Sequence, residues 1–164
     1  MTSVDNSVQG YNPDFMKRAV ELSALSLNAE SGCGPFGAVI IKNGCIIAEA
    51  TNEVIKQNDP TCHAEVNCIR KACQTLKTYD LLGCELYASC EPCPMCLSAI
   101  IWAGIEKVYY ANTAKQADEI GFRDNHIYEW IKGKKTDLNL DLEHHKNDRA
   151  EQVFSDYQKQ GIIY

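Results

Sequence analysis

The sequence predicts an α/β fold built on a mixed β-sheet. Asn43-Gly44 separates two apolar runs, a pattern typical of a tight hairpin between antiparallel strands. Helix and strand patterns then alternate from residue 61 to residue 111, and such connections place successive strands parallel with helices across the sheet. The 164 residues suffice for about one domain with its own core.

The first predicted helix starts at Asn12 and Pro13, because asparagine caps helices and proline fits the first helical position. Residues that would share one helix face recur at helical spacing up to about residue 28. Glycines around Pro35 then interrupt the pattern. We expect the hairpin strands at residues 38–41 and 45–48.

The remaining elements follow from the same patterns. Thr61 is a suitable cap for a helix that reaches about residue 76, and Glu151 follows Asp148 as in a capping box. The full set comprises strands at 85–88, 107–111 and 138–142, and helical segments at 92–103, 114–120, 127–131 and 148–160.

Composition restricts the class of protein. Residues 1–11 show no periodicity and are expected to form a flexible arm, whereas residues 12–164 form a single domain. A net charge of −6 disfavours nucleic acid and anionic membranes as partners. The chain contains neither a membrane-spanning apolar stretch nor the pattern of a secretory leader, so we expect it in the cytoplasm. Nine cysteines in a reducing compartment argue for metal ligands rather than disulfides.

The residues that indicate chemistry are His63, Glu65, Cys93 and Cys96. Cys93-Pro94-Met95-Cys96 opens a predicted helix, where the backbone N–H groups and the helix dipole favour thiolates. His63 completes three protein ligands, the number typical of a catalytic zinc site that leaves one position to water. Glu65 is placed to move protons without binding the metal. His-x-Glu followed by Pro-Cys-x-x-Cys is the known signature of zinc deaminases.

Other metal sites remain open as alternatives. An iron–sulfur site that used Cys90 would need a further cysteine at position 100, where this chain has Ile100. Cys90 or Cys62 as a fourth ligand would close the site into a structural zinc module without turnover. Glu65 favours the catalytic interpretation, because a structural site does not require it.

Several runs of sequence resemble the cytidine-deaminase-like zinc hydrolase superfamily, and within it the small bacterial guanine deaminases. The runs are Asp59 to Val66, Ser89 to Leu97 and Ala99 to Ala103, and Gly121-Phe122-x-Asp124 supports the narrower group. The resemblance covers nearly the whole chain from the first helix. It implies a three-layer α/β/α fold with a central five-stranded mixed sheet.

The resemblance also implies a reaction, the zinc-dependent hydrolysis of guanine to xanthine and ammonia. It assigns zinc to His63, Cys93 and Cys96, and proton transfer to Glu65. It implies that the small nucleobase substrate is bound by further residues, namely Asn52, Asp124, Phe36, Trp102 and Tyr164.

Two further expectations complete the prediction. The resemblance implies a homodimer that exchanges C-terminal segments, so that Tyr164 closes the site of the other subunit. Deamination of cytosine or cytidine stays open as an alternative, since those bases would meet the same metal and glutamate. A tRNA adenosine deaminase is disfavoured by the net charge of −6, because tRNA binding calls for a basic surface.

Overall fold

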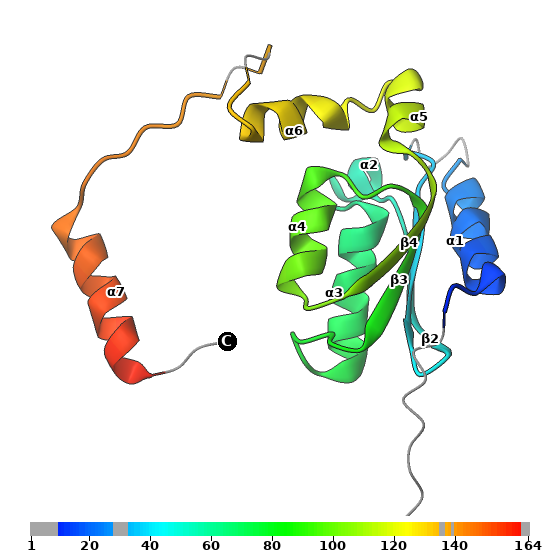
Figure 1. The fold of residues 1–164 in the computed structure, drawn as a ribbon, viewed down its shortest axis with the longest axis horizontal. Helices are drawn as coiled ribbons and strands as arrows, with labels where there is room; N and C mark the ends of the chain where they lie inside the picture. The colour runs from blue at the N-terminus through cyan, green and yellow to red at the C-terminus, as the bar shows by residue number, and fades with distance from the viewer. Residues whose placement is uncertain (1–9, 28–32, 135–136, 139, 162–164) are drawn as a thin grey trace, which may run out of the picture.

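The structure is a computed structural model that describes residues 10–27, 33–134, 137–138 and 140–161 (Figure 1). Four strands are assigned in this part: β1 (Gly37–Lys42), β2 (Cys45–Thr51), β3 (Cys84–Cys90) and β4 (Lys107–Asn112). The helices are α1 (Pro13–Leu25), α2 (Val54–Gln57), α3 (Ala64–Leu76), α4 (Pro94–Trp102), α5 (Ala114–Glu119), α6 (Asp124–Ile131) and α7 (Asp148–Gln160). No helix within these residues is long and apolar enough to span a membrane.

The strands form one mixed sheet in the order β2-β1-β3-β4, which confirms the predicted α/β class. β1 pairs antiparallel with both β2 and β3, and β3 pairs parallel with β4. β2, β3 and β4 therefore all run in the same direction. Since α3 follows β2 and α4 follows β3, both helices begin at the same end of the sheet.

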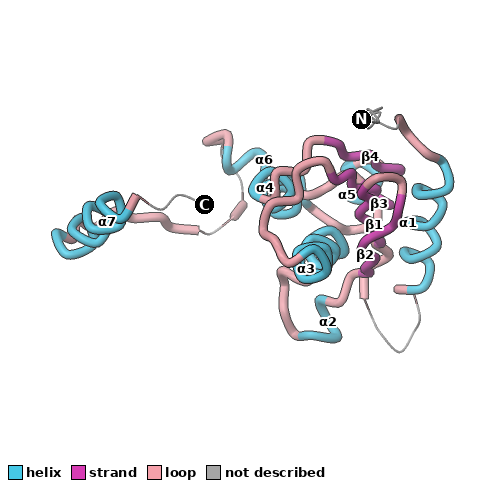
Figure 2. The backbone as a smooth tube through the Cα atoms, turned by 90° about the horizontal axis from the view of Figure 1, so that it is seen from below, coloured by secondary structure: helices cyan, strands magenta, loops and turns pink. Residues whose placement is uncertain are grey.

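Helices cover both faces of the sheet (Figure 2). On one face, α1 packs against Val39, Ile41 and Tyr87. On the other face, α3 and α4 pack over a cluster that includes Ile40 and Leu86. The alternation of Val39, Ile40 and Ile41 between the two clusters follows from the two-residue period of a strand.

The prediction of a fifth strand at residues 138–142 is wrong. The sheet formed by the described residues has four strands. After β4, α5 and α6 lead the chain away from the sheet edge (Figure 1). The described residues of 138–142 lie in a connecting loop. Alternating apolar residues specify a face for a strand but do not supply a neighbouring strand.

Helix α7 stands apart from the rest of its own chain (Figure 1). Every residue of α7 is exposed. The helix is nevertheless amphipathic, and its exposed apolar side chains include Val153, Phe154 and Tyr157. Its position and exposure leave this apolar face unburied within one chain.

Gly37 provides a test of the packing between α1 and β1. A Cβ atom at Gly37 would lie 2.4 Å from the carbonyl oxygen of Ala19 and 2.6 Å from the backbone nitrogen of Ser23. We expect Gly37→Ala to lower the free energy of unfolding by about 1–3 kcal/mol, because the α1 backbone must move. Denaturant titration measures this change.

The control is Gly10→Ala, since a Cβ atom there meets nothing within 4 Å. Its free energy of unfolding should stay within about 0.5 kcal/mol of the parent protein. Equal stability of the two variants would contradict the close approach of α1 to β1.

Candidate active site

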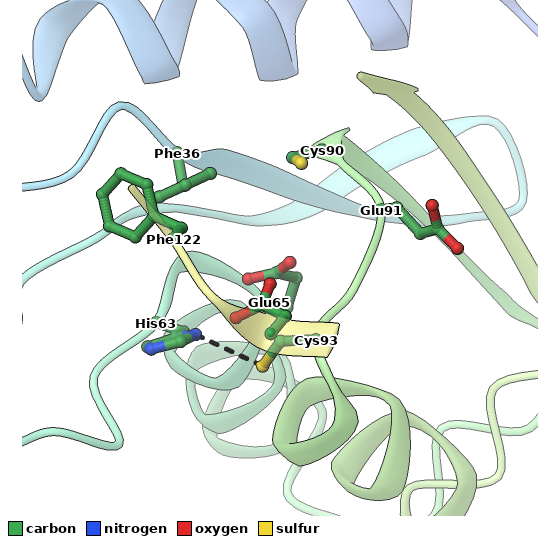
Figure 3. A pocket seen from close by; sticks show the side chains of 8 residues that line it. Phe36, His63, Glu65, Cys90, Glu91, Cys93 and Phe122 are labelled. Carbon is green, nitrogen blue, oxygen red and sulfur yellow. Dashed lines mark hydrogen bonds between the residues drawn. The ribbon is translucent and has the colours of Figure 1, made fainter. Parts of the chain in front are cut away.

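Two helix starts bring His63, Cys93 and Cys96 together. His63 caps α3, Cys93 caps α4, and Cys96 lies in the first turn of α4. His63 Nδ1 lies 3.6 Å from Cys93 Sγ and 3.5 Å from Cys96 Sγ. The close view shows the contact between His63 and Cys93 (Figure 3). The structure thus joins three residues that the sequence separates.

The donor set suits zinc. The three ligand atoms all lie within 4.8 Å of one another, and no other such group of His, Cys, Asp and Glu side chains occurs among the described residues. Tetrahedral zinc with bonds of about 2.0–2.3 Å separates its ligand atoms by about 3.5 Å, close to the observed distances. One nitrogen and two sulfurs leave one tetrahedral position without a protein ligand.

The two cysteines considered as a fourth ligand are engaged elsewhere. The Cys62 thiol donates to Asp59 Oδ2 at 3.3 Å, and the Cys90 thiol donates to the carbonyl oxygen of Thr113 at 3.7 Å. Neither residue belongs to the group of three. This arrangement argues against a closed structural site.

The cluster stabilises negative charge on sulfur. The pKa of Cys93 is lowered to about 4, first by the hydrogen bond from Cys96 and also by His63. The pKa of Cys96 is raised, because its thiol donates to Cys93 and is buried beside Glu65. The pKa of His63 is raised chiefly by the Cys93 thiolate, against the effect of burial. These directions place the negative charge of the cluster on the sulfur of Cys93.

Glu65 lies beside the cluster. It is in the first turn of α3, is only 6% exposed, and its Oε2 accepts from Cys96 Sγ at 3.5 Å. Burial raises the pKa of this carboxyl to about 7. A carboxyl that titrates near neutral pH can both take up and release protons there, as a general acid–base requires.

These side chains open into one cavity (Figure 3). Its walls come from the residue before β1, the start of α3, the loop between β3 and α4, and the start of α6. The lining residues are Phe36, His63, Glu65, Cys90, Glu91, Cys93, Phe122 and Asp124. A molecule in the cavity would therefore touch the metal ligands, Glu65 and Asp124 together.

Asp124 and Phe36 reach the cavity as the sequence predicts. The pKa of Asp124 is raised, mainly by burial and further by the negative charge of Cys93. Phe122 contacts Phe36 edge to face, with ring centroids 4.7 Å apart. Phe122 and Glu91 also line the cavity, although the sequence motifs that contain them predicted no role for either, and Cys90 lines it rather than serving as a metal ligand.

Asn52 and Trp102 do not line this cavity. Asn52 is buried, but its Oδ1 accepts from the backbone N–H of Val54 at 3.1 Å and shapes a turn. The prediction that Trp102 lines the substrate site is not met in this chain. Helix α4 buries Cys96 and Ile100, which leaves Trp102 on another face and 81% exposed. Tyr164 lies outside the described residues.

The helix that carries His63 starts later than the sequence suggests. Thr61 does not cap α3, because its N–H and hydroxyl both donate to Asp59 Oδ1, at 2.7 and 2.6 Å. His63 therefore takes the cap position in an extended conformation. His63 therefore lies at the N-terminus of α3 rather than within its first turn.

Comparison with known proteins gives consistent results. The cytidine and deoxycytidylate deaminase zinc-binding region matches residues 11–112. A guanine deaminase of Bacillus subtilis (strain 168) is 57% identical over 117 residues, which cover 71% of this chain and 74% of that protein. A tRNA-specific adenosine deaminase of Aquifex aeolicus (strain VF5) is 47% identical over 87 residues, 53% of this chain and 58% of that protein.

The fold agrees with this sequence similarity. An X-ray structure of guanine deaminase from Bacillus subtilis superimposes with a TM-score of 0.84 and 46% identity. The superposition covers 91% of this chain and 94% of that chain. The zinc ligand set, the matched region and the shared fold lead to one conclusion: this chain belongs to the family with the cytidine and deoxycytidylate deaminase zinc-binding domain.

Proposed function

We propose that this protein is a zinc-dependent guanine deaminase that hydrolyses guanine to xanthine and ammonia in purine catabolism or salvage. The observation that carries the proposal is a single cavity lined by His63 and Cys93 of the metal cluster, the Glu65 carboxyl and Asp124, with Cys96 buried next to His63 and Glu65. The similarity to Bacillus subtilis guanine deaminase in sequence and in structure supports guanine as the substrate.

The metal is held by His63, Cys93 and Cys96 in this proposal. When bound, zinc lowers the pKa of a coordinated water to about 7 and so makes hydroxide available at neutral pH. The three side chains already lie at ligand distances, so little reorganisation is needed to hold the ion.

Glu65 carries the protons of the reaction. It takes one proton from the attacking water and delivers it to ring N3 of guanine; once the oxygen is bonded to C2, it takes the second proton of that oxygen and passes it to the 2-amino group. The water oxygen bonds to C2 and the amino group leaves as ammonia, which yields xanthine. The pKa of about 7 that burial gives Glu65 suits both halves of this transfer.

Asp124 selects the base. Guanine presents the N1–H and the 2-amino group side by side as donors, and an ionised carboxylate accepts only. Adenine and cytosine present other patterns of donors and acceptors, so the carboxylate fits guanine best. Phe36 and Phe122 add an apolar wall for the flat ring.

Two related activities are less well supported. Cytosine and cytidine would meet the same metal cluster and Glu65, but their donor pattern suits Asp124 poorly. Several relatives are tRNA-specific adenosine deaminases, such as the Aquifex aeolicus protein. The net charge of −6 does not favour binding to a tRNA backbone.

We expect the purified protein to release ammonia from guanine at least about 100-fold faster than from cytosine, cytidine or adenine, the size of effect that mismatched buried hydrogen-bond groups produce. An enzyme-coupled ammonia assay at equal substrate concentrations measures the rates. Faster release from cytosine or cytidine would replace guanine deamination with the alternative activity.

Glu65→Gln tests the proton transfer. We expect this variant to keep its zinc and its fold but to lose at least about 1000-fold in kcat, because an amide cannot shuttle protons. Metal analysis, circular dichroism and the ammonia assay give the three readouts. Glu106→Gln, an exposed glutamate outside the cavity, is the matched control. Retained turnover by Glu65→Gln would refute the mechanism.

We further propose a cytoplasmic homodimer in which residues 12–164 form one domain and the C-terminal segment docks on the other subunit. The exposed apolar face of α7 supports the exchange, because it has no core in its own chain to cover it. Tyr164 at the end of this segment would then close the partner's site. Cysteines of the core such as Cys68 and Cys84 are free thiols, which suits a reducing compartment.

Phe154→Asp tests the exchange. This side chain is 79% exposed in the single chain, so a charge there costs nothing unless a second subunit buries it. We expect light scattering to show a shift from dimer toward monomer and a parallel loss of guanine turnover. Gln152→Asp, on the opposite face of the same helix, is the control. An unchanged dimer in both variants would argue against docking through α7.

A further inference from the structure

The segment that carries the base-recognition residues has little apolar anchorage. Residues 112–128, here called the recognition segment, run from the end of β4 through α5 into α6 and include Phe122 and Asp124. Ala117 is the sole buried residue of α5, and α6 has none. Its position must therefore depend on a small number of specific contacts.

Four hydrogen bonds tie the recognition segment to residues 90–92, directly before the ligand Cys93. The N–H of Glu91 donates to the carbonyl oxygen of Asn112 at 2.8 Å, and the N–H of Ala114 donates to Glu91 Oε2 at 2.8 Å. The others are Cys90 Sγ to Thr113 O, at 3.7 Å, and Tyr128 Oη to Pro92 O, at 3.3 Å.

Two side chains hold the two ends of the segment. Glu91 binds its start, at the first residue of α5. Tyr128 binds its end, and lies one helical turn beyond Asp124, on the same face of α6. Phe122 and Asp124 lie between these two attachments. Their positions are therefore fixed relative to residues 90–92, directly before Cys93.

We propose that Glu91 and Tyr128 are positioning residues that set the placement of Asp124 relative to the metal ligands. The inference rests on the proposed function, in which Asp124 binds guanine and Cys93 binds zinc. A displacement of about 1 Å at a recognition group is enough to weaken catalysis substantially. Loss of either attachment should therefore weaken guanine binding while the metal site stays intact.

Tyr128→Phe removes only the hydroxyl that donates to Pro92. We expect KM for guanine to rise about five-fold, the value of one neutral hydrogen bond, with kcat within about two-fold of the parent enzyme. Zinc content should not change. Tyr110→Phe, on exposed β4, is the matched control and should leave KM unchanged. An unchanged KM in Tyr128→Phe, or loss of its zinc or fold, would overturn the inference.

Glu91 needs a test that separates positioning from direct chemistry, because Glu91 also lines the cavity. Glutamine keeps a side-chain oxygen that can accept from Ala114, whereas alanine does not. We therefore expect Glu91→Ala to raise KM about five-fold or more and Glu91→Gln to restore it to near the parent value. Equal defects in both variants would show that the charge of Glu91 acts directly, and would overturn its positioning role.

A double-mutant cycle measures the coupling between Tyr128 and Asp124. If Tyr128 acts through Asp124, Tyr128→Phe should have little effect on kcat/KM in the Asp124→Asn background. Additive effects would overturn the inference. Guanine turnover by the parent enzyme distinguishes the two proposals. If the parent enzyme does not turn over guanine, the proposed function is contradicted. If it does and the effects of the two substitutions are additive, only the positioning role is contradicted.

Discussion

The structure depends on one geometric constraint, which is that two helices must begin at the same end of the sheet. β2 and β3 run in the same direction, so the helices that follow them present their first turns side by side. His63 comes from one helix start and the two cysteines from the other. The helix dipoles favour thiolates there, which prepares the cluster for a cation.

Burial at the same place gives the site its acid–base chemistry. Glu65 is held in the first turn of α3 against Cys96, away from solvent, and this burial raises its pKa to about 7. An exposed glutamate would keep its ordinary pKa and would hold a proton taken from water far less readily at neutral pH. The sheet end thus provides both the ligands and the proposed proton carrier, while the core behind it, built on residues such as Ile40 and Leu86, keeps the helices in place.

In the proposed function, chemistry and base recognition come from different parts of the chain. The match to the family covers residues 11–112 and includes the three ligands and Glu65. Phe122 and Asp124 lie beyond it, in the recognition segment. Relatives named for guanine and for tRNA adenosine resemble 71% and 53% of this chain, respectively. A segment with few buried residues can vary without disturbing the metal site, provided that attachments such as those of Glu91 and Tyr128 keep it in register.

Local sequence determined the elements and the ligand set of this protein, because caps, turns and short spacings act through neighbouring residues: Asn43-Gly44 formed the hairpin and Cys93-x-x-Cys96 opened a helix. Tertiary structure decided the rest. Residues 138–142 alternate yet found no strand to pair with, and Trp102 faces outward because α4 buries another face. The roles proposed for Phe122, Glu91 and Tyr128 rest on contacts between distant segments, which only the folded chain brings together.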